Sequence, residues 1–218
     1  MSQLITSSVS VSLDGYMAGP SQDEANPLGR NGTRLHEWIF ATKSGREMIG
    51  QDGGSQGVDD GYFNPDSDEV GATIMGRNMF GPVRGSWEGS NWRGWWGESP
   101  PFHHPVFVLT HFERPDLVMD DTTFHFVTGG AELAMSQARD VARGRDVKVG
   151  GGAATLHQFL KVRLIDELNL AVVPVELAVG ERLIEAVGQW PSGYECRNIV
   201  PGEGATHYEL VRTGSAGQ

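Results

Sequence analysis

Three consecutive glycines lie between two patterned segments in DVKVGGGAATLHQFL, residues 146–160. The segment before them is an apolar run, and the segment after them has helical periodicity. A helix N-terminus offers unpaired N–H groups and the positive end of the helix dipole, and glycines let an anion reach the main chain. The pattern predicts a pyrophosphate site, with a tight turn that needs positive φ as the alternative. It matches neither G-x-G-x-x-G nor the Walker A motif.

A second strand-to-helix junction pairs a glycine with an arginine in IMGRNMFG, residues 74–81. The Arg77 guanidinium is suited to bidentate pairing with a phosphate. An ordinary surface salt bridge is the alternative for this side chain. The two junctions, at Gly76 and at Gly150–Gly152, are therefore expected to bracket one dinucleotide.

Other residues that could do chemistry are scattered along the chain. Asp14 ends the first predicted strand at an Asp-Gly pair, where it either closes a turn or lies near a substrate. His103 and His104 have no third ligand at a helpful spacing, so they are interpreted as loop residues and no metal site is predicted. Asp166 and Glu167 are interpreted as a helix-to-strand junction that faces solvent or a subunit neighbour.

Four tryptophans gather in the irregular, glycine-rich segment 81–101. A loop of this length in a compact domain tends to be functional or disordered. Its indole rings are suited to stack on a flat heteroaromatic substrate, and equally to fill the core or an interface. Both interpretations stay open for Trp87, Trp92, Trp95 and Trp96.

Strands and helices alternate along the chain, which predicts an α/β fold with a largely parallel sheet. No repeat or linker divides the chain, so residues 1–218 are predicted to form a single domain. Strands are predicted at 4–13, 72–76, 105–111, 124–129, 146–149 and 165–177, helices at 35–42, 131–142 and 153–164, and a terminal antiparallel hairpin at 194–200 and 206–212.

Two of these helices have a predicted buried face. In the first, Leu35, Trp38 and Ile39 fall on one side. In the second, the buried side is predicted to consist of Leu133, Ala134, Ala138, Val141 and Ala142.

Composition excludes several classes of protein. The net charge of −11 over 218 residues argues against nucleic-acid binding, which draws on clustered lysine and arginine. The single cysteine, Cys196, excludes an internal disulfide and a cysteine-rich metal site. No apolar run is long enough for a membrane span, and the first residues lack the pattern of a secretory signal. A cytoplasmic protein is expected.

Four segments occur in an order that resembles a known superfamily: VSLDGYMAGP, ATIMGRNMFGP, PVFVLTH and VGGGAATLHQFLKVRLIDELNLAVVPVELAVGERL. Together they look like the dihydrofolate-reductase-like superfamily. They are most similar to stand-alone bacterial members of the family of the C-terminal reductase domain of the riboflavin-biosynthesis deaminase-reductase. The sequence lacks the H-x-E…P-C-x-x-C zinc motif, since it has one cysteine, so the bifunctional enzyme is not expected.

The resemblance implies a twisted, mostly parallel sheet of about eight strands flanked by helices, NADPH as hydride donor, and a homodimer. Carried over by position, it assigns the nicotinamide, pyrophosphate and adenosine ends of the cofactor to residues along the four segments. These residues are Ser10, Met17, Ala18, Gly19, Gly76, Arg77, Asn78, Met79, Leu109, Thr110, His111, Gly150, Gly151, Gly152, Ala153, Ala154 and Thr155. Arg77, His111 and Arg114 are the residues available for a 2′-phosphate.

One departure from the superfamily concerns the first helix, RLHEWIF. Dihydrofolate reductases carry an acidic residue where this chain has Leu35, or His36 if the register slips by one, which makes folate reduction doubtful. Leu35 and Trp38 are therefore assigned to the substrate pocket. His36 and Asp14 are the candidate catalytic residues, because a histidine has a pKa near neutrality; packing or surface exposure is the alternative for His36.

The sequence thus predicts an NADPH-dependent reductase that transfers a hydride to a small pterin-like, pyrimidine-like or carbonyl substrate. Two alternatives remain open. One is a true dihydrofolate reductase with an unusual proton donor. The other is a non-catalytic protein that binds a nucleotide or heterocycle, since a fold alone does not imply a reaction.

Overall fold

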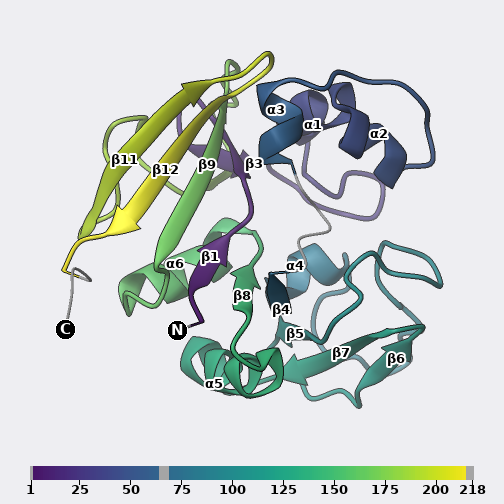
Figure 1. Ribbon diagram of the computed structural model, residues 1–218. Helices are drawn as coiled ribbons and strands as arrows, with labels where there is room; N and C mark the ends of the chain where they lie inside the picture. The colour runs from purple at the N-terminus through teal and green to yellow at the C-terminus, as the bar shows by residue number, and fades with distance from the viewer. Residues whose placement is uncertain (1, 64–68, 215–218) are drawn as a thin grey trace.

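A ten-stranded sheet runs through the computed structural model, which describes residues 2–63 and 69–214 (Figure 1). The strand order is β11-β12-β9-β1-β8-β4-β5-β7-β6, and β2 extends β1 along the edge of β9. The strands are β1 (Leu4–Thr6), β2 (Val9–Ser12), β4 (Val70–Gly76), β5 (Val106–Leu109), β6 (Leu117–Met119), β7 (Thr122–Val127), β8 (Asp146–Val149), β9 (Glu167–Val173), β11 (Tyr194–Pro201) and β12 (Thr206–Arg212). Two short strands, β3 (Tyr16–Ala18) and β10 (Glu181–Arg182), form a separate antiparallel pair.

The centre of the sheet is parallel and both of its ends are antiparallel. β6 pairs antiparallel with β7 at one end, and the hairpin of β11 and β12 joins β9 at the other. The predicted α/β class and terminal hairpin are therefore confirmed. The sheet has ten strands rather than about eight, because the expected strand 4–13 is interrupted at Ser7 and Ser8 and because β6 had not been anticipated.

Helices cover the two faces of the sheet in different ways (Figure 1). The faces are covered by η1 (a 3₁₀ turn, Gly32–His36), α1 (Glu37–Ala41), α2 (Lys43–Met48), α3 (Val58–Tyr62), α4 (Arg77–Phe80), α5 (Gly130–Ala142) and α6 (Ala153–Lys161). On one face, α5 and α6 pack against β1, β4, β8 and β9. On the other face, η1 and α1 cover β9, and the tryptophan-rich segment covers β4, β5 and β7.

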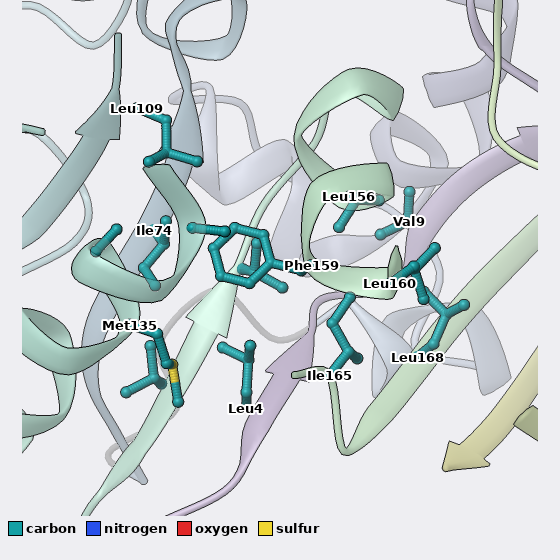
Figure 2. Close-up of a cluster of buried hydrophobic side chains, with 14 of the residues drawn as sticks. Leu4, Val9, Ile74, Leu109, Met135, Leu156, Phe159, Leu160, Ile165 and Leu168 are labelled. Carbon is teal, nitrogen blue, oxygen red and sulfur yellow. The ribbon is translucent and has the colours of Figure 1, made fainter. Parts of the chain in front are cut away.

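The main core lies between the sheet and the pair α5 and α6. Figure 2 shows Phe159 of α6 among side chains from β1, β4 and α5, and it is fully buried. Leu4 of β1 and Ile74 of β4 belong to the same cluster, because alternate residues of a strand point to the same face of the sheet. This packing fixes the first turn of α6 against the carboxyl ends of the central strands.

The predicted buried face of α5 is partly wrong. Leu133 and Val141 are 45% and 37% exposed, whereas Ala131 and Met135 are buried beside the expected alanines. Small side chains let the helix lie close to the sheet, which turns the larger Leu133 and Val141 outward. On the first helix, the expected burial of Leu35, Trp38 and Ile39 is confirmed.

The helices of the described residues are all shorter or more polar than a membrane span requires. The longest, α5, has 13 residues.

Candidate functional site

The glycine triplet joins β8 directly to α6. The Gly150 N–H donates to the C=O of Ile74 at 2.8 Å, and the Thr155 N–H donates to the C=O of Gly152 at 3.0 Å. None of the three glycines has φ in the left-handed region, so the alternative of a turn that needs positive φ is wrong. The peptide bond between Gly151 and Gly152 is cis.

The space beside the triplet is left open by the fold. A Cβ built at Gly151 would meet only the Met17 Cε, at 3.1 Å, and one at Gly152 would meet only the Glu181 Oε2, at 3.4 Å. Both atoms end flexible side chains, so packing among the described residues does not demand glycine at these two positions. No side chain caps the first turn of α6. Open space beside uncapped N–H groups is the geometry of an anion site.

The second junction lies against the first. A Cβ at Gly76 would collide with the Thr155 hydroxyl, so here the packing of α6 demands glycine. The Arg77 Nε donates to the C=O of Val83 at 3.0 Å, and the guanidinium carbon lies 3.7 Å from the centre of the Trp87 ring. These partners are not carboxylates, so the salt-bridge alternative for Arg77 does not describe its contacts. The two junctions therefore lie side by side, and their bracketing of one dinucleotide stays a prediction.

Two adjoining cavities meet at the turns. The large cavity has a volume of about 540 Å³ and the small cavity about 290 Å³, and Asn78 and Gly152 line both. Among the residues predicted to bind cofactor, Ser10, Met17, Ala18, Asn78, Met79, Gly150, Gly151 and Gly152 line the large cavity. Arg77, Asn78, Leu109, Thr110, His111, Gly152, Ala154 and Thr155 line the small cavity. Gly19, Gly76 and Ala153 lie outside both linings.

The small cavity carries unbalanced positive charge. Burial, followed by repulsion from Arg84 and Arg114, lowers the pKa of Arg77. The Arg77 Nη2 is buried and has no hydrogen-bond partner among the described residues. Arg84 and His111 also line this cavity, and Glu181 is the one carboxylate in its described lining. An anion with several acceptor oxygens would satisfy the free donor.

Arg114, expected near a 2′-phosphate, is instead held among aromatic rings. Its Nη2 donates to the C=O of Trp92 at 2.6 Å, and its guanidinium lies 4.8 Å from the ring centres of Trp87 and Phe126. It lines neither cavity. Its contribution to the small cavity is therefore a nearby charge rather than a direct contact.

The first helix sends one polar side chain into the large cavity. His36 lines it, while Leu35 is fully buried outside both linings. Trp38 is 2% exposed, and its Nε1 donates to the Ser10 Oγ at 2.9 Å beneath the cavity wall. Burial lowers the pKa of His36 to about 4, which leaves the ring neutral at neutral pH.

Asp14 closes a turn and lines neither cavity. Its carboxylate accepts hydrogen bonds from the Ser12 hydroxyl at 2.6 Å and from the N–H groups of Leu177 and Ala178 at 3.1 and 2.7 Å. Burial opposes ionisation, but these bonds outweigh it and lower the pKa of Asp14 below its usual value. Such a carboxylate holds the 177–178 segment and has little tendency to release a proton at neutral pH.

The other histidines and acidic residues considered in the sequence lie at different places, some at the large cavity and some at the surface. The His104 Nε2 lies 2.8 Å from the Thr73 Oγ1 at the edge of the large cavity, and burial is the main cause that lowers the pKa of His104 to about 4. His103 pairs with Asp121 at the surface. Asp166 forms an ion pair with Arg212 of β12 rather than facing open solvent. Within the described ranges, no group of His, Cys, Asp or Glu is arranged to hold a metal ion.

The tryptophans fill a second core cluster and reach the large cavity at one point. Trp87 is 7% exposed and packs on Phe80, and Trp92 donates from its Nε1 to the C=O of Phe80 at 3.0 Å. Trp96 both packs on Phe124 and lines the large cavity. Core packing therefore describes Trp87 and Trp92, Trp96 alone of the four tryptophans lines the large cavity, and stacking on a substrate stays a prediction.

Several lining residues were missed by sequence reasoning. They include Gln22, Tyr62, Lys148 and Asn169 in the large cavity and Arg84 in the small one. These residues come from separate loops, helices and strands, and none stands in a recognisable motif. The break in the expected strand 4–13 had no signal in the sequence either, although Ser7 and Ser8 at this break line the large cavity.

Comparison with protein families matches residues 3–190 to the RibD C-terminal domain. The chain belongs to this family. The resemblance carried by the four quoted segments is therefore confirmed. A search of the curated proteins finds no match.

Two solved structures that are similar to this RibD C-terminal domain cover almost the whole chain. One is a "Putative riboflavin biosynthesis protein" from Shewanella sp. PV-4, with 22% identity, 98% of this chain and 99% of that chain covered, and a TM-score of 0.56. Another is the dihydrofolate reductase from Enterococcus faecalis complexed with NADP(H) and RAB-propyl, with 14% identity, 98% and 97% covered, and a TM-score of 0.49. The hairpin of β11 and β12 lies beyond the residues that the family matches.

Proposed function

We propose that this RibD C-terminal domain is an NADPH-dependent reductase that transfers a hydride to a small pterin-like, pyrimidine-like or carbonyl substrate. The observation that carries the proposal is the buried Nη2 of Arg77, which has no hydrogen-bond partner among the described residues and lies beside a first turn of α6 that none of their side chains caps. A pyrophosphate or 2′-phosphate would supply the missing acceptor and meet the helix dipole. NADPH, when bound, supplies the hydride.

The chain's own residues would divide the cofactor between the two cavities. Arg77, Arg84 and His111 of the small cavity suit the phosphate-bearing adenosine end. Gly150 and Gly151 leave the wall of the large cavity open to the nicotinamide end. The shared wall between the cavities would hold the pyrophosphate in between.

The substrate end of the large cavity argues against folate reduction. Leu35 offers no carboxylate, and His36 is neutral because its pKa is lowered to about 4. The role of the protein in the reaction would then be mainly to position an electrophilic carbon next to the hydride donor. Protonation would come from water or from a substrate-bound group rather than from an ionised side chain of this helix.

Thermal unfolding with NADPH and with NADH tests the cofactor assignment. A ligand at about one hundred times its Kd adds roughly 2.7 kcal/mol of stability, which raises the Tm of a chain of this size by about 5–10 °C. We expect this shift with NADPH, a much smaller one with NADH, and the loss of most of the NADPH shift in Arg77→Leu.

The matched control is Arg139→Leu, on the exposed side of α5 and away from both cavities. It removes the same charge and should keep the full NADPH shift. No shift with either nucleotide at millimolar concentration would overturn the proposal and favour a protein that binds another ligand. Oxidation of NADPH, followed by absorbance, then identifies substrates.

A further inference from the structure

The large cavity extends well beyond the glycine triplet along one face of the sheet. Its inner end is formed by Gly150, Met17 and His36. Its lining also includes Thr73 of β4, Lys148 of β8 and Glu167 of β9, which the strand register brings into one row across the sheet, and we call this part its outer end. A nicotinamide ring would occupy only the inner end. The outer end is therefore available to the substrate.

Few charged groups line this cavity, and its two carboxylates are paired with an arginine outside the lining. Among its described lining residues there is no arginine, and the charged side chains are Lys148, Glu167 and Glu209. Arg197 pairs with Glu167 at 2.8 Å and with Glu209 at 3.4 Å, and the Tyr62 hydroxyl donates to Glu209 at 2.9 Å. Lys148 has an interaction of its own. One lysine against two carboxylates offers no site for a multiply charged anion.

The two histidines of the cavity add no positive charge. Burial lowers the pKa of both His36 and His104 to about 4. The small cavity is the opposite case, since Arg77 and Arg84 line it with one carboxylate. The molecule thus separates a phosphate-binding cavity from a neutral one.

The rest of the large cavity offers neutral hydrogen-bonding groups on an apolar wall. Residues with hydroxyl and amide side chains line it on five segments, and apolar and aromatic residues complete the lining. The hydroxyl and amide groups are Thr6, Ser7, Ser8, Ser10, Thr73, Gln22, Asn78 and Asn169. Such a lining recognises the edges of a flat heterocycle and the hydroxyl groups of its substituent.

We infer that the substrate of the large cavity is a neutral heterocycle with an uncharged, hydroxyl- or amide-bearing substituent, and not a phosphorylated or carboxylated one. This inference rests on the proposed function and specifies its substrate class. A phosphate placed in the large cavity would lose its water and meet two carboxylates without a matching set of cationic groups.

Matched pairs of compounds that differ by one phosphate test the inference. Riboflavin and its 5′-phosphate, inosine and its 5′-phosphate, and cytidine and its 5′-phosphate serve as probes. Binding is measured by equilibrium dialysis on the protein saturated with NADP⁺, so that the small cavity is occupied, and again without nucleotide. On the saturated protein we expect the neutral member of at least one pair to bind roughly tenfold or more tightly than its phosphate.

Tighter or equal binding of the phosphorylated members to the saturated protein overturns the inference and leaves the proposed function intact. Absence of binding by every probe also overturns it, because the cavity would then not take a heterocycle. Failure of NADP⁺ to bind overturns the proposed function, and the pairs measured without nucleotide then still decide the charge preference of the large cavity.

A gain of charge in the cavity gives an independent check. Met48 lines the large cavity and is 45% exposed, whereas Phe40 is 40% exposed and lines neither cavity. Met48→Arg should tighten binding of the phosphorylated probes by about threefold or more and leave the neutral ones unchanged. Phe40→Arg is the control and should change neither. Equal behaviour of the two variants contradicts the inference.

Discussion

His36 enters the large cavity from the end of η1 with an uncharged ring. Its pKa is lowered to about 4, so at neutral pH it offers one donor nitrogen and one acceptor nitrogen rather than a proton to release. The side chain of its neighbour Leu35 has no polar atom and cannot hydrogen-bond to a substrate. The geometry therefore suits His36 to orient a neutral substrate by hydrogen bonding, and its participation in catalysis stays a prediction.

The lowered pKa of His36 predicts a pH dependence of stability. The ordinary value is 6.5 and the folded value about 4, so between these two the unfolded chain takes up the proton first. The contribution of the neutral His36 ring to the free energy of unfolding is complete above about pH 6.5. This contribution is lost as the pH is lowered toward 4. His36→Gln should remove on the order of 1–3 kcal/mol of this loss.

Urea unfolding at pH 7.5 and pH 5.0 measures the effect. The difference in stability between the two pH values should be smaller in His36→Gln than in the wild type. His104, which has the same lowered pKa, stays in place in both proteins and contributes equally to both slopes. Identical slopes in the two proteins would show that the His36 ring is not held neutral by the fold.

At the scale of elements, the junctions were predictable and some of the packing was not. β8 with α6 and β4 with α4 lie where an apolar run, a glycine and a helical period meet in the sequence. The buried face of α5 was misassigned because alanines, rather than Leu133 and Val141, set the close approach of helix and sheet. The break at Ser7 and Ser8 has no glycine or proline to announce it.

The candidate site could likewise be predicted from the sequence only in part. Its small cavity could be predicted because the contributing residues follow strand ends in recognisable order. The outer end of the large cavity could not, since Tyr62, Lys148 and Asn169 come from α3, β8 and β9. Their meeting depends on the topology of the sheet and on how α3 is held, which local pattern does not encode.

Substitutions at two glycines near strand ends test ligand binding and folding separately. A Cβ at Gly150 would lie 2.7 Å from the Met79 Sδ and 3.1 Å from its Cε, the movable end of a side chain. Gly150→Ala should therefore cost no more than about 1–2 kcal/mol of stability, while its methyl group displaces Met79 at the wall of the large cavity and weakens NADPH binding roughly tenfold. Thermal unfolding with and without NADPH measures both quantities.

Gly71→Ala is the matched control. Its Cβ would lie 2.6 Å from the backbone oxygen of Ala142 at the end of α5, which cannot move without shifting the helix. We expect a loss of about 2–4 kcal/mol of stability and unchanged NADPH affinity of the folded protein. Equal losses of stability in the two variants would mean that the triplet serves the fold rather than a ligand.

At the scale of the whole molecule, the terminal hairpin of β11 and β12 packs against α3 through a buried contact. Asp59 of α3 lies 2.8 Å from the His207 Nε2 of β12, and the two side chains are 3% and 1% exposed. The Gly204 N–H donates to the same carboxylate at 2.6 Å, and the Tyr62 ring stacks on His207 with centres 4.1 Å apart. This contact fixes the wall of the large cavity that Tyr62 and Glu209 form.

Asp59→Ala tests whether this buried contact holds the outer wall in place. The variant leaves His207 and the Gly204 N–H buried without their acceptor, which should cost about 2–4 kcal/mol of stability and lower the Tm by roughly 5–15 °C. Asp59→Asn keeps an acceptor oxygen and should lose markedly less. The NADPH-induced shift should survive in both variants, because α4, α6 and the carboxyl ends of β5 and β7 build the small cavity without α3. Binding of neutral heterocycles should weaken in Asp59→Ala alone. Wild-type stability of Asp59→Ala would show that the hairpin and α3 are held by other contacts, and the large cavity would then owe its shape to the sheet rather than to the pair.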